Sequence, residues 1–189
     1  MPPPLKTEKQ KMLAGELYNS EDSALTAERL HAAALLHKYN STPDHPATHQ
    51  PLLREILASC GEHSAIRPPF FCDYGYNIHL GSGVFLNFNC VLLDVNTIEI
   101  GDRTQIGPAV QIYTADHPRD PKARRTNLEC SKPVRIGRNV WIGGGSIILP
   151  GITIDDNAII GAGSVVTHDV PTGITVIGNP ARKKEAPAE

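Results

Sequence analysis

Aliphatic side chains recur at every sixth position in the second half of the chain. The run consists of Ile136, Ile142, Ile148, Ile154, Ile160 and Val166. A six-residue period fits neither an α-helix nor a simple amphipathic strand. It is typical of a solenoid in which each hexapeptide forms one flat face and the periodic aliphatic points into the coil. The pattern therefore predicts a mainly β chain that winds into a parallel β-helix.

The same period runs through the preceding residues in two frames. The first frame holds Cys60, Ile66, Cys72, Ile78, Val84 and Cys90, and the second holds Ile100, Ile106 and Ile112. The second frame is in phase with the run from Ile136, but the ten residues from Cys90 to Ile100 are not a multiple of six. One altered corner is therefore expected within 94–97.

Residues 113–135 interrupt the pattern. They contain Pro118, Pro121 and Pro133 and five Lys or Arg before Arg135, but no periodic aliphatics. This composition predicts a loop extruded from the coils. Long loops inside compact domains are usually functional, so this loop is the first place in which to look for chemistry.

The first part of the chain has a helical pattern instead. Apolar residues recur at helical spacing in 6–18 and 26–39, and 50–59 forms a third helical stretch. Short helices build little core alone, whereas a solenoid needs its open ends covered. The expected parts are a helical segment at 1–59 on the acceptor side, a β-helix at 60–180 and a C-terminal tail at 181–189.

Composition narrows the classes of function. The 189 residues carry a formal net charge of −2, which argues against a surface for nucleic acid or anionic membranes. No apolar run is long enough to span a bilayer and no cleavable signal-like start is present, so we expect a cytoplasmic protein. The four cysteines lack the CxxC spacing of a zinc site, and a disulfide framework is not expected.

Several motifs together carry a family resemblance. They are the opening KMLAGELY, then CDYGYNIHLG, IYTADHPRDPKAR and VWIGGGSIILPG, among repeated hexads. With them the chain resembles the maltose O-acetyltransferase and galactoside acetyltransferase group of hexapeptide-repeat acyltransferases. The resemblance implies a left-handed parallel β-helix, acetyl-CoA as co-substrate, a sugar acceptor, no metal, and a homotrimer with active sites between subunits.

His117 is the expected general base. Transfer of an acetyl group from a thioester to a hydroxyl needs a base that is neutral near pH 7, and histidine is the side chain with such a pKa. His117 lies in the extruded loop and matches the family's catalytic histidine. Glu129 of the same loop is expected to orient the other ring nitrogen, as a carboxylate does in a triad. The hydroxyl then attacks directly, and a backbone N–H near Gly144 stabilises the oxyanion.

The acceptor site is expected to contain polar residues from several coils. Asn87 matches an active-site asparagine of the family, although an asparagine that only stabilises a turn would have the same pattern. Asp73 and Asp94 are expected to bind sugar hydroxyls. The galactoside pattern has an acceptor-binding aspartate after its AGELY-like segment, where this chain has Asn19 and Ser20. Ser20 is therefore included in the acceptor site, and the identity of the sugar stays open.

The donor site is expected to be a groove along the coils. By resemblance, Gly144 and Ala162 offer backbone contacts to the pantetheine arm of coenzyme A. Thr167 and His168 flank that arm further along, and Arg182 approaches the nucleotide.

Two other functions and one residue stay open. Trp141 either lines the donor groove or packs between subunits. A metal-dependent hydratase of the carbonic-anhydrase type on the same fold would use His79 and His117, but Arg119 and Lys122 stand in the region of its third histidine, so a three-histidine zinc site is not available. The other alternative is a structural trimer without catalysis.

Overall fold

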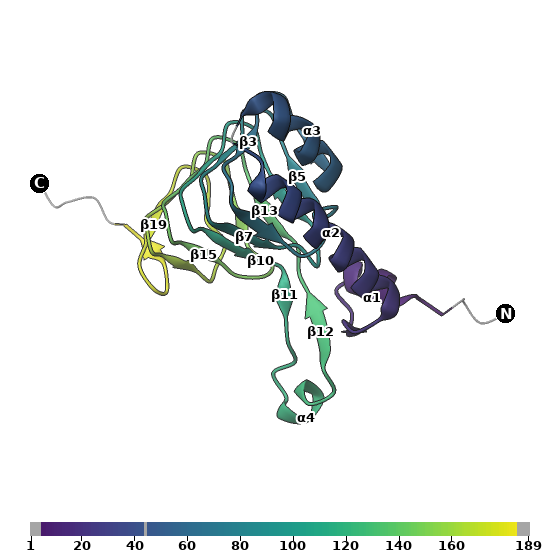
Figure 1. Cartoon of the computed structure of the whole chain (residues 1–189). Coiled ribbons are helices and arrows are strands. Elements are labelled where there is room, and N and C mark those ends of the chain that lie inside the picture. The colour runs from purple at the N-terminus through teal and green to yellow at the C-terminus, as the bar shows by residue number, and fades with distance from the viewer. Residues whose placement is uncertain (1–4, 44, 185–189) are drawn as a thin grey trace, which may run out of the picture.

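The computed structural model describes residues 5–43 and 45–184. Its central feature is a left-handed parallel β-helix, in which each coil contributes one short strand to each of three flat faces (Figure 1). The predicted fold class is therefore confirmed. Within the described chain, no helix is both long and apolar enough to cross a lipid bilayer.

The faces are numbered in the order in which the chain visits them. Face one consists of β2 (Ser59–Cys60), β5 (Ile78–Leu80), β8 (Ile98–Ile100), β13 (Val134–Ile136) and β16 (Thr153–Ile154). Face two consists of β3 (Ala65–Ile66), β6 (Phe85–Leu86), β9 (Gln105–Ile106), β14 (Trp141–Ile142), β17 (Ile159–Ile160), β19 (Thr175–Ile177) and the antiparallel β20 (Arg182–Lys183). Face three consists of β4 (Phe70–Cys72), β7 (Cys90–Leu93), β10 (Gln111–Tyr113), β15 (Ile147–Ile148) and β18 (Val165–Val166).

The predicted aliphatic stacks form in the last coils. Ile136 pairs with Ile154, and Ile142 and Ile148 make the equivalent pairs on the other two faces. These side chains are buried in one continuous core. Because the equivalent aliphatic of each coil lies on its predecessor, a six-residue period is enough to specify this part of the fold.

The first predicted frame is wrong after Cys72. The residues that stack on Ile100, Ile106 and Ile112 are Leu80, Leu86 and Leu92, which lie two positions beyond Ile78, Val84 and Cys90. The cause is a two-residue insertion at 73–77, before the altered corner that the sequence predicted at 94–97. Ile78, Val84 and Cys90 are also buried, because residues two apart on a strand point to the same side.

All insertions lie at one corner of the solenoid, between face three and face one. Segments 73–77 and 94–97 each add two residues to successive coils, and the next coil carries the extruded loop at this corner. The loop is more ordered than predicted. Its two arms, β11 (Ala115–Asp116) and β12 (Leu128–Ser131), form an antiparallel hairpin with α4 (Pro121–Arg124) at its tip, and the hairpin projects away from the coils (Figure 1).

The N-terminal segment contains α1 (Glu8–Leu13), β1 (Tyr18–Asn19), α2 (Ser23–Ser41) and α3 (Pro46–Ile56). Asp22 caps α2 by accepting from the N–H groups of Ala24 and Leu25, and Pro46 occupies the first turn of α3, where proline is favoured. These signals explain why both helices begin before their predicted starts. Leu36, Tyr39, Leu53 and Ile56 join the solenoid core, so α2 and α3 cover its first coil.

Two further segments differ from the expected pattern. Helix α1 ends early because Gly15 adopts φ +72°, and a Cβ at that position would lie 2.9 Å from the Ser131 carbonyl oxygen of β12. At the other end, Arg182 and Lys183 form β20 on the edge of face two, although a tail was predicted there. The remainder of the predicted tail, residues 185–189, lies outside the described residues.

Candidate active site

The hairpin and the N-terminal segment meet at Glu129. Strand β1 pairs with β12, with Tyr18 opposite Glu129. The Tyr18 hydroxyl donates to Glu129 Oε2 over 2.7 Å. Tyr18 is buried, and burial together with this hydrogen bond raises the pKa of its phenol, so the hydroxyl stays protonated and keeps donating. Sequence reasoning missed Tyr18, because its partner is 111 positions away along the chain.

Asp73 and Ser20 lie in the same cluster. Asp73 is half-buried, and burial raises the pKa of its carboxyl to about 6, with Arg29 opposing and Glu129 adding to the shift. Arg29 of α2 donates to the Tyr74 hydroxyl over 2.8 Å and to the Ser20 carbonyl over 2.8 Å. The structure thus gathers two predicted acceptor-side residues, Ser20 and Asp73, around Arg29, which the sequence did not single out.

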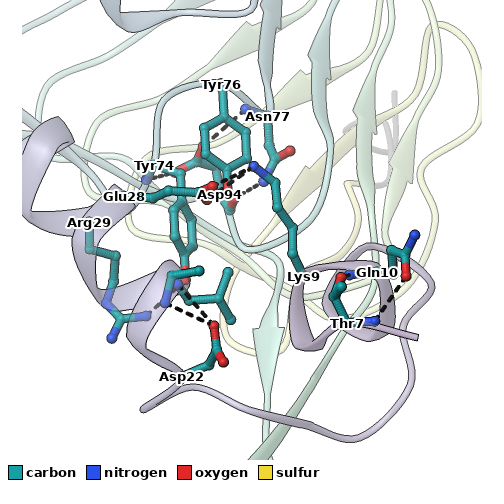
Figure 2. Close-up of polar contacts among 12 residues, drawn as sticks. Thr7, Lys9, Gln10, Asp22, Glu28, Arg29, Tyr74, Tyr76, Asn77 and Asp94 are labelled. Carbon is teal, nitrogen blue, oxygen red and sulfur yellow. Dashed lines mark hydrogen bonds and ion pairs between the residues drawn. The ribbon is translucent and has the colours of Figure 1, made fainter. Parts of the chain in front are cut away.

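The helices are fastened to this corner by a second set of polar contacts, drawn in Figure 2. The Tyr76 hydroxyl donates to Glu28 Oε2 over 2.6 Å, and Lys9 Nζ pairs with Glu28 Oε1 over 2.9 Å while lying 4.0 Å above the Tyr76 ring. These contacts join α1, α2 and the insertion at 73–77. They fix both helices to the 73–77 corner of the solenoid.

Asp94 has a structural role in place of the predicted contact with sugar. Its side chain is fully buried, and Oδ1 accepts from the backbone N–H groups of Asp73 and Tyr74 over 2.9 Å each. Figure 2 shows Asp94 beside Tyr74 and Asn77. Oδ2 accepts from the N–H of Asn77 over 3.3 Å. Burial raises the pKa of the carboxyl to about 7, while these three donors act in the opposite direction. A carboxylate that is fully occupied in this way braces the 73–77 corner and has no exposed surface for an acceptor.

His117 directly follows β11 and is exposed. Asp116 pairs with Cys130 across the hairpin, and continuing this register by one residue would set His117 opposite Glu129. Directly opposed residues of an antiparallel pair have their side chains on the same side. Among the described residues, nothing hydrogen-bonds to the imidazole, so both ring nitrogens are accessible for proton transfer.

Asn87 lies at a different corner, between face two and face three. It follows β6, and its Oδ1 accepts from the N–H of Phe88 over 2.9 Å. This contact is that of an asparagine that stabilises a turn, one of the two interpretations of the sequence, while the side chain stays partly exposed. Within one chain, Asn87 and His117 are therefore not brought together.

Gly144 and Ala162 lie at the same corner as Asn87, in later coils. Gly143 and Gly145 donate their N–H groups to neighbouring coils. The N–H groups of Gly144 and Ala162, in contrast, donate to no other described residue. The equivalent position one coil earlier is Pro108, which has no N–H. Two free donors, one coil apart and both partly or fully exposed, therefore stand in a row along this corner.

The remaining donor-side residues are distributed over the last coils. Trp141 stands on the outer side of β14 with 58% of its surface exposed. Thr167 and His168 follow β18 at the hairpin corner, and Thr167 Oγ1 lies 2.8 Å from His168 Nδ1. His168 and Arg182 both line a cavity of about 530 Å³ at the end of the solenoid. The predicted donor residues thus occupy two corners and one face of a single chain.

The predicted alternative function requires a metal site. Within residues 5–43 and 45–184 there is no group of three or more His, Cys, Asp or Glu side chains arranged to hold a metal ion. His79 stands on the outer side of β5, and its Nδ1 lies 3.4 Å from Ser59 Oγ. It is on face one, whereas His117 lies in the hairpin.

Known proteins match this chain at both ends and along its length. Residues 11–61 match the family model of the maltose acetyltransferase hexapeptide capping motif, and residues 133–168 match that of the bacterial transferase hexapeptide (six repeats). Nodulation protein L of Rhizobium meliloti (strain 1021) is 58% identical over 178 residues, which cover 94% of this chain and 97% of that protein. The chain belongs to the hexapeptide-repeat acetyltransferases.

This acetyltransferase is also similar to solved structures. The maltose O-acetyltransferase from Clostridium difficile 630 has a TM-score of 0.94 at 47% identity, with 97% of this chain and 99% of that chain covered. A galactoside acetyltransferase in complex with coenzyme A has a TM-score of 0.91 at 35% identity, with 96% and 91% covered. The predicted resemblance to the maltose and galactoside acetyltransferase group is confirmed.

Proposed function

We propose that this acetyltransferase transfers an acetyl group from acetyl-CoA to a hydroxyl of a glucose- or maltose-type sugar, with His117 as general base. One observation carries the proposal. An exposed histidine follows the strand pair that sets Glu129 beside the N-terminal segment, and Asp73 and Ser20 are gathered at the same corner. A base next to half-buried carboxylates is suited to a polyhydroxylated acceptor, because carboxylate oxygens accept hydrogen bonds from sugar hydroxyls.

The reaction needs no covalent acetyl-enzyme. The His117 imidazole removes the proton of the acceptor hydroxyl, and the resulting oxygen nucleophile attacks the thioester carbonyl carbon. As the C–S bond breaks, the thiolate of coenzyme A takes the proton from the imidazolium. Proton transfer by a positioned base contributes about 10²–10⁴-fold to such a step. Glu129, already held by Tyr18, is proposed to face the second ring nitrogen.

The free N–H groups at the other corner are proposed to hold the donor. The Gly144 N–H would stabilise the developing negative charge on the thioester oxygen, a contribution of about 10²–10³-fold for one such donor. The Ala162 N–H would bind the pantetheine arm one coil further along. A Cβ at Gly143 would lie 2.5 Å from the Ala162 nitrogen, so glycine is required for the coils to stack this closely.

The active form is proposed to be a homotrimer. In one chain the hairpin with His117 and the row of Asn87, Gly144 and Ala162 lie on different corners, so a second copy is needed to complete the site. The side chains on the outside of each face support this assembly.

On each face, the strand residues next to the buried aliphatics point outward and form one row along the solenoid. The outward row of face three is Phe71, Val91, Gln111, Ile147 and Val165. The outward row of face two is Ala65, Phe85, Gln105, Trp141, Ile159 and Thr175. The outward row of face one is Ser59, His79, Glu99, Arg135 and Thr153.

Faces two and three are therefore largely apolar outside, whereas face one is polar. Large exposed apolar surfaces usually mark interaction sites. The two apolar faces flank the corner with the free N–H groups, so subunits packed there would border the proposed donor groove. Face one would remain in contact with water.

An acceptor panel tests the proposal. Purified protein and acetyl-CoA are incubated with maltose, glucose, galactosides, other oligosaccharides and amino sugars, and free thiol is measured against a control without acceptor. We expect thiol release with a glucose- or maltose-type sugar, an acetyl ester in the product, and intersecting double-reciprocal plots. Parallel plots, or acetyl label on the protein, would contradict the direct transfer. Turnover restricted to an amine acceptor would contradict O-acetylation.

A further inference from the structure

Both backbone polar groups of His117 are held by its two neighbours Asp116 and Arg119. The His117 N–H donates to Asp116 Oδ1 over 2.8 Å, and the His117 carbonyl accepts from Arg119 Nη1 over 3.3 Å. The two neighbours are themselves joined. Arg119 Nη2 donates to Asp116 Oδ2 over 3.0 Å, and Nη1 lies 2.9 Å from Asp116 Oδ1. A closed ring of charge-assisted contacts therefore surrounds the peptide units of the histidine.

The two residues of this ring differ in exposure. Asp116 belongs to β11, where it pairs with Cys130, and 25% of its side chain is exposed. Arg119 lies in the turn towards α4, and 83% of its side chain is exposed. The carbonyls of Pro118 and Arg119 accept from Arg124 over 3.3 Å each, which ties the turn to the helix at the tip. The ring thus connects a paired strand of the hairpin to a solvent-exposed turn.

We propose that Asp116 and Arg119 form a clamp that positions His117 for proton transfer. This inference rests on the proposed role of His117 as the base. Asp116 and Arg119 are positioning residues, since they act on the backbone of the histidine and leave its ring free. A misplacement of about 1 Å at a reacting group can cost about 10²-fold in rate, so fixing the peptide on both sides of His117 affects turnover. Substrate binding is not affected, because neither residue belongs to the proposed acceptor or donor contacts.

The clamp has a property that a buried support would lack. Exposed ion pairs are weak and are screened by salt, since the Debye length falls from about 10 Å at 0.1 M to about 3 Å at 1 M ionic strength. Turnover of the wild-type protein is therefore expected to fall as salt rises. A variant without the ion pair should have a lower turnover that no longer responds to salt in this way.

The test uses the full-length protein with acetyl-CoA and the sugar of the acceptor panel that is acetylated fastest. For Arg119→Ala we expect kcat to fall about two- to fivefold, in keeping with the modest strength of exposed pairs, with both KM values unchanged. Arg119→Lys should recover part of the loss, because a lysine can pair with Asp116 but cannot form the fork. Asp116→Asn should resemble Arg119→Ala, and the double variant should lose no more than either single one.

The matched control is Arg125→Ala. It removes one positive charge from the same exposed hairpin tip, where the Arg125 side chain lies outside the clamp. Its kcat and its salt dependence should both be those of the wild-type protein. An equal loss in Arg125→Ala would mean that the hairpin charge, not the clamp, sets turnover. A wild-type kcat in Arg119→Ala, or an unchanged salt dependence, would overturn the clamp.

Failure of the clamp and failure of the proposed function give different results. If His117→Ala abolishes turnover while Arg119→Ala does not lower it, His117 is the base and the clamp proposal is wrong. If His117→Ala keeps full turnover, both the role of His117 and the clamp proposal are wrong. A measurement without any acceptor adds a second check, because the amide hydrogen of His117 should exchange faster in Arg119→Ala than in Arg125→Ala. Equal exchange in these two variants would also overturn the clamp.

Discussion

At the scale of single residues, His117 is the side chain on which the proposed chemistry depends. His117→Ala should lower kcat by about 10²–10⁴-fold, because the variant loses only proton transfer. Its affinity for coenzyme A and its sedimentation should be those of the wild-type protein. Calorimetric titration with coenzyme A and a turnover assay check both statements. A variant that kept more than about a tenth of the wild-type turnover would show that another group is the base.

Asp73 makes stability depend on pH in a defined direction. Burial raises the pKa of its carboxyl to about 6 from 3.8, so the folded protein holds this proton to a higher pH than the unfolded chain. Protonated Asp73 therefore stabilises the folded state relative to the charged form. This stabilisation is complete below the pKa of Asp73 in the unfolded chain and is lost as the pH rises through its pKa in the folded protein. When the pH rises from 4 to 6.5, the melting temperature of Asp73→Asn should therefore fall less than that of the wild-type protein.

The comparison is made by calorimetry at several pH values. Exposed Asp155 supplies the control, and Asp155→Asn should keep the wild-type dependence on pH. Asp94, whose pKa is raised to about 7 in part by the Asp73 charge, titrates in all three proteins, so the difference between Asp73→Asn and the wild type reports Asp73 together with its effect on Asp94. Identical slopes would mean that the Asp73 carboxyl is solvated in solution.

Residue identities alone could indicate part of this site. His117 was predicted because its chemistry suits the reaction and because its loop resembles the one that holds the family's catalytic histidine. Tyr18, the hydrogen-bond partner of Glu129, was not predicted, since the two residues meet only through the pairing of β1 with β12. Asp94 was assigned to the acceptor because its burial could not be seen in the sequence. A buried aspartate that braces a corner and an exposed one that binds sugar look the same until burial is known.

At the scale of elements, the corner at 73–77 depends on the Asp94 carboxylate. Asp94→Ala leaves three backbone N–H donors at this corner without their acceptor, and each buried donor left unpaired costs about 1–3 kcal/mol. We expect Asp94→Ala to lower the free energy of unfolding by several kcal/mol or to prevent folding. Urea denaturation measures this effect.

Asp94→Asn keeps an acceptor oxygen and serves as the milder variant. It should fold with an intermediate stability and an acceptor KM near that of the wild type. A large rise in acceptor KM without any loss of stability would return Asp94 to the sugar site. Comparing stability with acceptor KM separates a structural role of Asp94 from a role in binding sugar, because only loss of the structural role changes the unfolding transition.

The elements also show where the hexapeptide count succeeds and where it fails. From Ile136 to Val166 no coil carries an insertion, so counting by six gives every stack in that stretch. The next coil is two residues shorter, and Val170 and Val176 stack on Ile154 and Ile160. Between Cys72 and Leu80 two extra residues enter, yet Ile78, Val84 and Cys90 are all apolar and buried. Counting by six therefore selected these three residues instead of the stacking residues, and nothing in the hydrophobic pattern indicated the shift. The hairpin was recognised as an extrusion, but its strands are too short to have a pattern of their own.

At the scale of the whole molecule, the proposed trimer can be tested on the outer faces. Ile147 is in the apolar outward row of face three, and Ile147→Glu would bury a charge in the proposed interface. An unpaired buried charge costs several kcal/mol, which weakens association by about 10²-fold or more. Sedimentation at micromolar concentration should show monomers, and turnover should fall with the loss of the trimer.

Ser59→Glu makes the same change on the polar face one and is the control. It should sediment and turn over as the wild-type protein does. If Ile147→Glu remained trimeric, face three would not be an interface. If it were monomeric and fully active, one chain would hold a complete site, and the division of His117 and Gly144 between copies would be wrong.

The concentration of all insertions at one corner has a consequence for how such enzymes diversify. The stacked coils have a constant spacing, and the free N–H groups of Gly144 and Ala162 lie one coil apart at a corner that has no insertion. Segments 73–77, 94–97 and the hairpin can change length or sequence without altering that spacing. If these segments hold the acceptor as proposed, acceptor preference can change through them while the spacing of the proposed donor site stays the same.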